Sequence, residues 1–147
     1  MSNDELDDVA SEYGRDRAIA LIKRELSRDA VSGTLTIIAN EGIHHLPDAY
    51  KRGELYIASR GNLDFSSLEI VKEQYEEILS LLAIKLKSQT WKNIYLVPFG
   101  HSTLCMQIKL LVFRVTRIET IDLFYDGRGN YEDLSIAQRS LIVNVAS

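Results

Sequence analysis

Apolar residues recur along the chain with two kinds of spacing, and these spacings predict its helices and strands. Spacings of three and four residues predict helices over residues 4–28, 66–88 and 103–115. The segment from Ser66 to Ser88 is the most regular of the three, and it opens with two serines suited to capping. Short β-branched and apolar runs predict strands over residues 34–39, 54–59, 94–97, 120–125 and 141–145.

Two segments follow the pattern less clearly. Residues 47–52 predict one helical turn between the first two strands, and residues 112–117 fit either the end of a helix or a strand. The predicted order is helix, strand, strand, helix, strand, helix, strand, a short polar segment with helical character, and a last strand. This alternation predicts the α/β class, as a three-layer Rossmann-like, mainly parallel sheet with helices on both faces.

The length of 147 residues suits a single domain, with an amino-terminal helix in residues 1–30 and an α/β core in residues 31–147. A formal net charge of -4 argues against general affinity for duplex nucleic acid or for an anionic membrane. The acidic amino terminus does not resemble a signal peptide, and no apolar run approaches the roughly 20 residues that span a bilayer. The expectation is a cytoplasmic protein without a membrane partner. Its single cysteine, Cys105, falls in an apolar helical pattern and is expected to be buried.

Four predicted strands are followed by segments that combine a glycine with polar side chains. Because the carboxyl ends of parallel strands meet at one edge of a sheet, where ligands bind in such folds, we expect these segments to converge. The expected ligand-binding residues are Asn40, Glu41, Arg60, Gly100, His101, Ser102, Thr103 and Arg128. Turns and helix caps use the same residue types, so each segment also has a purely structural explanation.

The segment from Gly100 to Thr103 carries the most specific chemistry of the four. Amides at a helix start, two hydroxyls and an imidazole suit a phosphodiester. Arg60 and Arg128 offer charge-assisted hydrogen bonds to the same group. If the ligand is hydrolysed, His101 and Glu41 are the candidates for the general acid or base, and the catalytic assignment stays open at this point.

Other site types find less support in the sequence. His44 and His45 are adjacent, so they point to opposite faces of an extended chain, and no cysteine or carboxylate cluster completes a metal site. Ser102, His101 and Asp126 contain the residue types of a hydrolase triad, but no G-x-S-x-G motif accompanies them. The glycine-rich motifs of dinucleotide and P-loop sites are missing as well. We therefore expect neither a metal nor a cofactor.

The carboxyl-terminal half resembles a known family over about residues 54–131. The run IYLVPFGHSTLCMQIKLLV, followed by IDLFYDGRGNY and preceded by the LEIVKEQYEEILSLL helix, is similar to the closing part of SAVED domains and the related CARF domains. The resemblance implies a Rossmann-like sensor of cyclic oligonucleotides or related messengers in prokaryotic antiviral defence. It places Gly100, His101, Ser102 and Thr103 in the loop between strand and helix, and Asn40 and Glu41 in the loop after the first strand.

The chain differs from that family in size. A SAVED domain contains two CARF-like halves and acts with an effector, whereas this chain has room for one half. The resemblance therefore implies a homo-oligomer or a partnership with an effector subunit. Three functions stay open: a nucleotide sensor, a small phosphodiesterase that degrades such a ligand, and a ligand-free interaction subunit. The third would use Tyr125, Tyr131 or the apolar helix after Thr103 as its contact.

Overall fold

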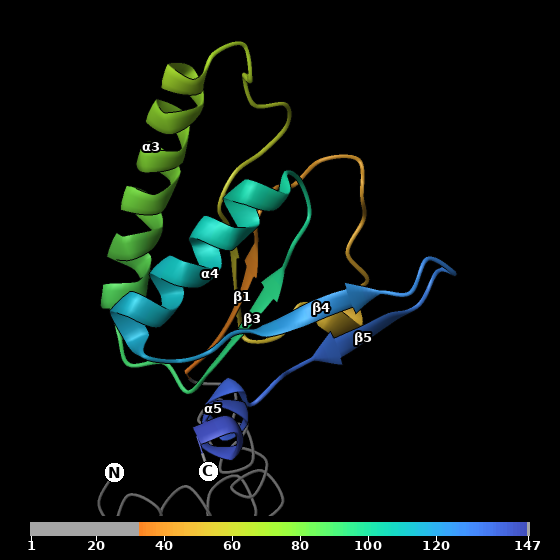
Figure 1. Ribbon diagram of the computed structural model, residues 1–147. Helices are drawn as coiled ribbons and strands as arrows, with labels where there is room; N and C mark the ends of the chain where they lie inside the picture. The colour runs from red at the N-terminus through yellow and green to blue at the C-terminus, as the bar shows by residue number, and fades with distance from the viewer. Residues whose placement is uncertain (1–32, 147) are drawn as a thin grey trace, which may run out of the picture. The chain divides into compact units, whose positions relative to one another are not determined.

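A five-stranded sheet forms the centre of the fold in the computed structural model, which describes residues 33–146 (Figure 1). The strand order is β2-β1-β3-β4-β5, with the first four strands parallel and β5 antiparallel to β4. The strands are β1 (Thr34–Ile38), β2 (Glu54–Ile57), β3 (Asn93–Val97), β4 (Ile121–Tyr125) and β5 (Tyr131–Leu134). The α/β class and the mainly parallel sheet are thus confirmed, while the predicted helix over residues 4–28 lies outside the described range.

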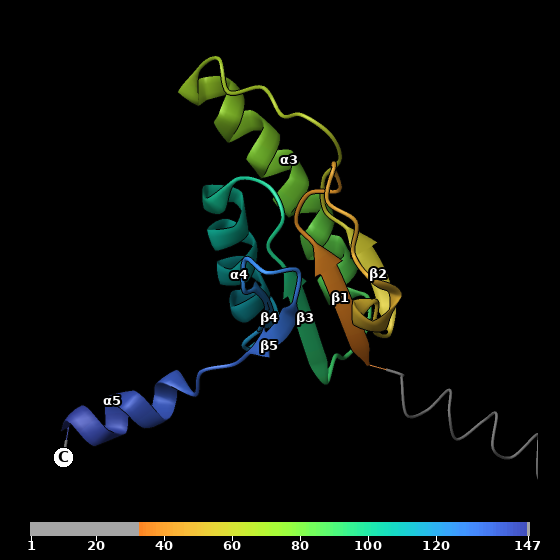
Figure 2. The ribbon, with the colours of Figure 1, turned by 90° about the vertical axis from the view of Figure 1, so that its right-hand side faces the viewer.

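Two helices cover one face of this sheet. α3 (Leu68–Lys87) joins β2 to β3, and α4 (Ser102–Thr116) joins β3 to β4. They pack side by side, as Figures 1 and 2 show. The other face is crossed by the link between β1 and β2, which contains the 3₁₀ turn η1 (Asp48–Tyr50). Helices on both faces are therefore not confirmed within residues 33–146.

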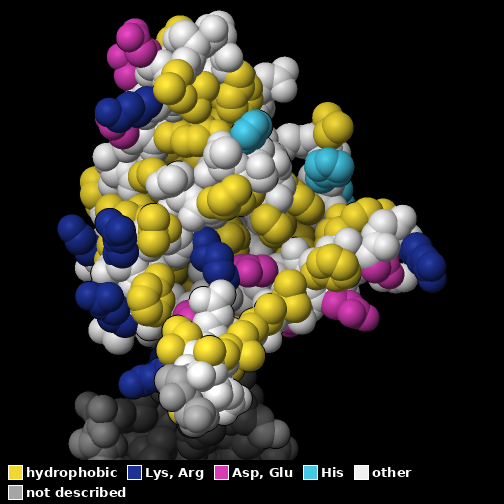
Figure 3. Space-filling model, in the orientation of Figure 1, with side chains coloured by type: hydrophobic (Ala, Val, Ile, Leu, Met, Phe, Trp, Pro, Cys, Tyr) yellow, Lys and Arg dark blue, Asp and Glu magenta, His cyan; other side chains and the backbone are white. Residues whose placement is uncertain are grey.

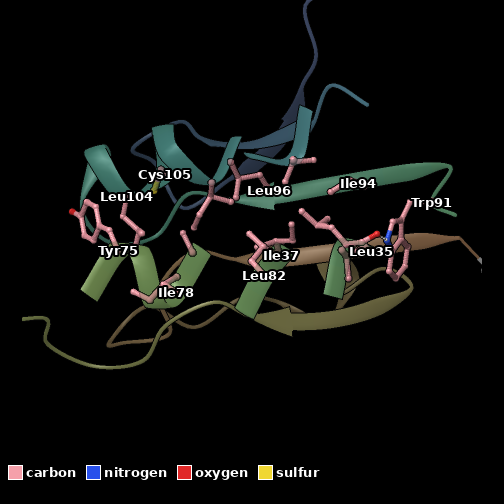
Figure 4. Packing of buried hydrophobic residues seen from close by; sticks show 14 residues of the cluster. Leu35, Ile37, Tyr75, Ile78, Leu82, Trp91, Ile94, Leu96, Leu104 and Cys105 are labelled. Atoms are coloured by element: carbon pink, nitrogen blue, oxygen red, sulfur yellow. Dashed lines mark hydrogen bonds between the residues drawn. The ribbon is translucent and has the colours of Figure 1, made fainter. Parts of the chain in front are cut away.

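The main hydrophobic core lies between the sheet and the two helices. Alternate residues of β1 and β3, among them Leu35, Ile37 and Ile94, point towards α3 and α4, as period-two alternation requires (Figure 4). The helices fill this space with apolar residues that are at most 9% exposed: Tyr75, Ile78, Leu82, Leu86, Leu104, Cys105, Ile108 and Val112. Cys105 is buried as expected.

A smaller core lies on the opposite face of the sheet. Ile38, Val97 and Leu123 come from three neighbouring strands and contact Leu46 of the β1–β2 link. Arg52 secures the link further by stacking 3.6 Å from the Tyr95 ring and donating two hydrogen bonds of 2.7 Å to the Asp133 carboxylate. Arg52 thereby ties the segment before β2 to β5 across this face of the sheet.

The prediction of a last strand over residues 141–145 is wrong. Residues 141–145 lie in a helix, α5 (Gln138–Ala146), and the edge of the sheet is instead occupied by β5. Propensity misled the prediction, because β-branched residues disfavour a helix only weakly. β5 forms because the turn before it is closed into a hairpin: Asp126 Oδ1 accepts hydrogen bonds from the amides of Arg128 and Asn130 (2.7 and 3.2 Å). Residues 112–116 are helical, which resolves the other ambiguity.

Among residues 33–146, no helix is both long and apolar enough to cross a membrane. α3, the longest helix in that range, has lysines or glutamates near both of its ends. Its amino terminus is capped by Ser67, whose hydroxyl accepts a hydrogen bond from the Ile70 amide. The serine pair recognised in the sequence therefore does begin this helix.

Two adjacent leucines of α3 provide a test of the main core. Leu82 is fully buried between sheet and helices, whereas Leu81 is 55% exposed. We expect Leu82→Ala to lower the free energy of unfolding by about 2–5 kcal/mol, because it leaves a cavity, and Leu81→Ala to cost less than about 1 kcal/mol. Urea denaturation of both variants measures the difference. Equal losses would contradict the placement of α3 on the sheet.

The Arg52–Asp133 ion pair provides a test by pH. The Arg52 guanidinium holds the pKa of Asp133 below its ordinary value, chiefly through the hydrogen bonds between them. A lowered pKa means that the pair stabilises the fold above the ordinary pKa of about 3.9 and that this contribution is lost as the pH falls below it. We expect Asp133→Asn to lower Tm at pH 7 and the gap to the wild type to narrow towards pH 3. Glu132→Gln on the same strand is the control, and the difference between its Tm and that of the wild type should not change with pH.

Candidate functional site

The candidate site lies at the carboxyl ends of β1, β2 and β3. The chain leaves β1 towards β2 and leaves β3 towards β4, so the connections diverge between two adjacent strands. Such a divergence is where open α/β sheets bind ligands. We call the residues gathered at this edge the crest, and they are Asn40, Glu41, Arg60, Gly100, His101, Ser102 and Thr103. Seven of the eight residues expected from the sequence are thus in the three loops of this edge.

Asn40 joins the ends of β1 and β2. Its amide nitrogen donates to Ser59 Oγ (3.0 Å) and to the carbonyl oxygen of Gly61 (2.9 Å), and Ser59 Oγ donates in turn to the carbonyl of Ala39 (2.6 Å). An asparagine amide has two protons, and both are engaged in these bonds. Asn40 therefore shapes the crest, and only its side-chain oxygen is left to accept a bond from a ligand.

Glu41 and Arg60 extend the pairing of β1 and β2 beyond the regular strands. Their backbones form an isolated parallel bridge, and Arg60 Nη1 lies 3.3 Å from Glu41 Oε1. The two side chains are 69% (Arg60) and 44% (Glu41) exposed. An ion pair this exposed adds little stability, so its guanidinium can exchange the carboxylate for an anion from solution at small cost. Arg60 is the cation of the crest that is best placed to meet a ligand.

Gly100 brings the loop after β3 against the end of β1. Its φ of +99° is one that side chains rarely adopt, and a Cβ here would lie 2.7 Å from Asn40 Cβ. The close contact explains why a glycine follows β3, and it fixes the distance between the two loops. The glycine after β3 thus serves a contact within the protein, between Gly100 and Asn40.

His101 caps α4. Its Nδ1 accepts a hydrogen bond from the Thr103 amide (3.2 Å) and lies 2.8 Å from Thr103 Oγ1, which also lies 2.8 Å from the Tyr75 hydroxyl. An Nδ1 that accepts from an amide carries no proton, so in a neutral ring the proton is on Nε2. His101 then presents a donor to the crest. This state suits donation of a hydrogen bond to a phosphate oxygen, while the ring nitrogen that could act as a base is already bonded to Thr103.

Ser102 and Arg128 have different surroundings. Ser102 is the first residue of α4 and is exposed beside His101. Arg128 lies in the β4–β5 turn, where its amide donates to Asp126 Oδ1 (2.7 Å), and Figure 1 shows this turn extending away from the start of α4. The structure therefore brings Ser102 to the crest and leaves Arg128 outside it. The sequence placed Arg128 with the others because it expected the β4 end to lead directly to a ligand loop.

Two rings near the crest, Phe65 and Phe99, were not recognised as candidates in the sequence. The Phe65 ring lies 4.9 Å from that of His101, and the Phe99 ring lies 5.3 Å from that of His44. Phe65 is 49% exposed and Phe99 is partly exposed. Their positions gave a weak signal, since Phe99 directly precedes Gly100 and Phe65 follows the second strand end. Exposed rings of this kind are surfaces on which a nucleobase stacks.

Within the described residues, the side chains are not arranged for metal binding or for attack by a cysteine nucleophile. No group of three or more His, Cys, Asp or Glu side chains within residues 33–146 is placed to hold a metal ion. Burial raises the pKa of the Cys105 thiol, which opposes formation of the thiolate that nucleophilic attack needs. The crest thus offers one guanidinium, one imidazole donor, hydroxyls and rings, a set suited to binding.

Comparison with known proteins returns no matching family model, no matching curated protein and no matching solved structure.

Gly100 allows a test of the crest's construction. Gly100→Ala forces a Cβ against Asn40, whereas Gly61→Ala, at φ +66°, meets nothing within 4 Å. Both variants carry backbone strain of roughly 1 kcal/mol, and we expect Gly100→Ala to lose about 1–3 kcal/mol more because the two loops must separate. Urea denaturation of the two variants gives the comparison. Equal destabilisation would show that the loops after β1 and β3 are not in tight contact.

Proposed function

We propose that the protein is a Rossmann-like sensor domain that binds a cyclic oligonucleotide or another phosphate-bearing nucleotide at the crest. The observation that carries the proposal is the convergence of three strand-end loops on one edge at the point where the sheet connections diverge. Ligand binding at such an edge is a general property of open α/β sheets.

The residues of the crest support a ligand with both phosphate and base. Arg60 supplies an exposed cation, and His101 and Ser102 are both exposed at the start of α4. The Phe65 ring lies beside the His101 ring, and Phe99 directly precedes Gly100 with its ring against His44, so both offer stacking surfaces near the crest. Anion, hydroxyl and ring contacts together suit a nucleotide better than an inorganic anion.

The residues of the crest favour binding of the ligand over its hydrolysis. His101 Nδ1 accepts a hydrogen bond from the Thr103 amide, and Glu41 Oε1 lies 3.3 Å from Arg60 Nη1, so both candidate bases are already engaged within the protein. Function in prokaryotic antiviral defence, with an effector subunit or a second copy, completes the proposal through the family resemblance.

Thermal shift and calorimetry on the purified protein test this function with cyclic di-, tri- and tetranucleotides and their linear forms as probes. We expect at least one probe to raise Tm. Arg60→Ala should then weaken its binding about 10- to 100-fold, since a charge-assisted hydrogen bond contributes roughly 1.5–3 kcal/mol. Arg128→Ala is the matched control, because it removes an arginine outside the crest, and it should bind like the wild type.

Three results would count against the proposal. A full panel without any shift would exclude a nucleotide sensor of this type. Equal loss of binding in Arg60→Ala and Arg128→Ala would move the site away from the crest. Conversion of the probe to a new product, detected by chromatography and abolished by His101→Ala, would replace the sensor with a phosphodiesterase.

A further inference from the structure

α4 has a second apolar side, which faces away from the sheet. Leu104, Ile108 and Val112 point into the core and are fully buried. The opposite side of the helix carries a stripe of large apolar residues at the spacing i, i+4 and i+7, and they are 62%, 45% and 40% exposed: Met106, Leu110 and Phe113. A helix that needs only one apolar side for its own fold gains nothing from such a stripe.

This stripe forms one wall of a groove. The amino-terminal half of α5 provides the other wall through Gln138, Arg139 and Ile142, and the open groove between the walls has a volume of about 990 Å³. Ile142 is 69% exposed, so both walls present apolar side chains to the solvent. Figure 3 shows hydrophobic side chains over α4 on the face that is turned to the viewer. A contiguous exposed apolar surface with polar edges is typical of a protein-interaction site.

The charges around the groove are mainly positive. Lys109 is neutralised by Asp122, with its Nζ 2.6 Å from Oδ2. Arg117, whose guanidinium lies 5.8 Å from the Phe113 ring, and Arg139 form no ion pair within the described residues, and they face one carboxylate, Glu119. The groove therefore favours an occupant that is apolar along its centre and acidic at its edge.

We propose that this groove binds an amphipathic helix of a partner protein, with apolar residues at i, i+4 and i+7 and acidic residues beside them. A helix fits a concave surface lined by a helical stripe, as in other helix-in-groove complexes. A second copy of α4 is disfavoured, because two identical surfaces bring like charges at Arg117 and Arg139 together. A bilayer is disfavoured because it is flat, whereas this apolar surface is a groove with α4 on one side and α5 on the other. The groove lies on the outer side of α4, away from the crest loops, and the proposal does not depend on a nucleotide.

A synthetic 20-residue amphipathic helix with leucines at these spacings and flanking glutamates is the probe, labelled for fluorescence anisotropy with the full-length protein. We expect it to bind, and a peptide of the same composition with scattered leucines not to bind. Leu110→Glu in the protein should weaken binding at least tenfold, because it places a carboxylate in the centre of the groove. Leu81→Glu is the matched control, since Leu81 is an exposed leucine of α3 outside the groove, and it should bind normally.

A charge exchange tests the acidic requirement separately. Arg139→Glu should weaken the glutamate peptide and strengthen a peptide with lysines in place of the glutamates, because the sign of the groove's edge is reversed. Circular dichroism of each variant establishes that it is folded.

Three outcomes would overturn the proposal. The first is equal binding of the ordered and scattered peptides, or binding that Leu110→Glu leaves unchanged. The second is a dimer in light scattering that Leu110→Glu dissociates, which would make a second copy the occupant. The third is sedimentation with vesicles of phosphatidylserine and phosphatidylcholine that Leu110→Glu abolishes, which would assign the surface to a membrane.

Discussion

The burial of β1 on both of its faces is the constraint on which the rest of the structure depends. Leu35 and Ile37 face the helices, while Thr36 and Ile38 face the β1–β2 link, and all four are at most 4% exposed. A strand enclosed in this way pairs in parallel with both neighbours, β2 and β3, and parallel neighbours need long crossovers. One crossover is the link with η1, and the other is α3. The chain leaves β1 towards β2 over one face and leaves β3 through α4 towards β4 over the other, so the two connections diverge at the crest, where Gly100 rests against Asn40.

The hydrogen bonds of the crest are satisfied mostly within the protein. Asn40 holds the β2 end, Gly100 rests against Asn40, and His101 and Thr103 bind each other and Tyr75. This order is the capping and turn function that the sequence offered as the plain explanation for the same residues. It also fixes the positions of the few groups that stay exposed, among them Arg60 and Ser102. A site built in this way loses little conformational entropy on binding, because its backbone is already in place.

Much of the fold followed from periodicity alone. The helix that became α3 and the strands β1 and β3 could be predicted because their apolar residues are dictated by burial against one another. β5 could not be predicted, because its residues, YEDL, carry no strand pattern and pair only through the hairpin that Asp126 closes. α5 was mistaken for a strand because local β propensity in LIVNV does not report the surroundings that decide between helix and strand.

The site was predicted less completely than the fold, for a related reason. Sequence order shows which polar residues follow strands, and so it gathered Asn40, Glu41, Arg60 and the segment from Gly100 to Thr103. It does not show that β4 turns back into an antiparallel partner, and so Arg128 was assigned to an edge that its loop leaves. Rings such as Phe65 were missed because they become part of the crest only through a contact across the sheet edge, 4.9 Å from the His101 ring.

α4 connects the two surfaces of interest, and its sequence shows why one helix can serve both. Its first turn is built from polar residues that cap the helix and form the crest, and its middle carries apolar residues on both sides. The inner side is required by the core. The outer stripe is not, because an exposed Met106, Leu110 and Phe113 add no packing energy to the isolated domain and increase its tendency to associate. One helix of 15 residues therefore carries a polar cap at one end, whose form the β3–α4 turn dictates, and an apolar stripe along its outer side that the fold of the domain does not dictate.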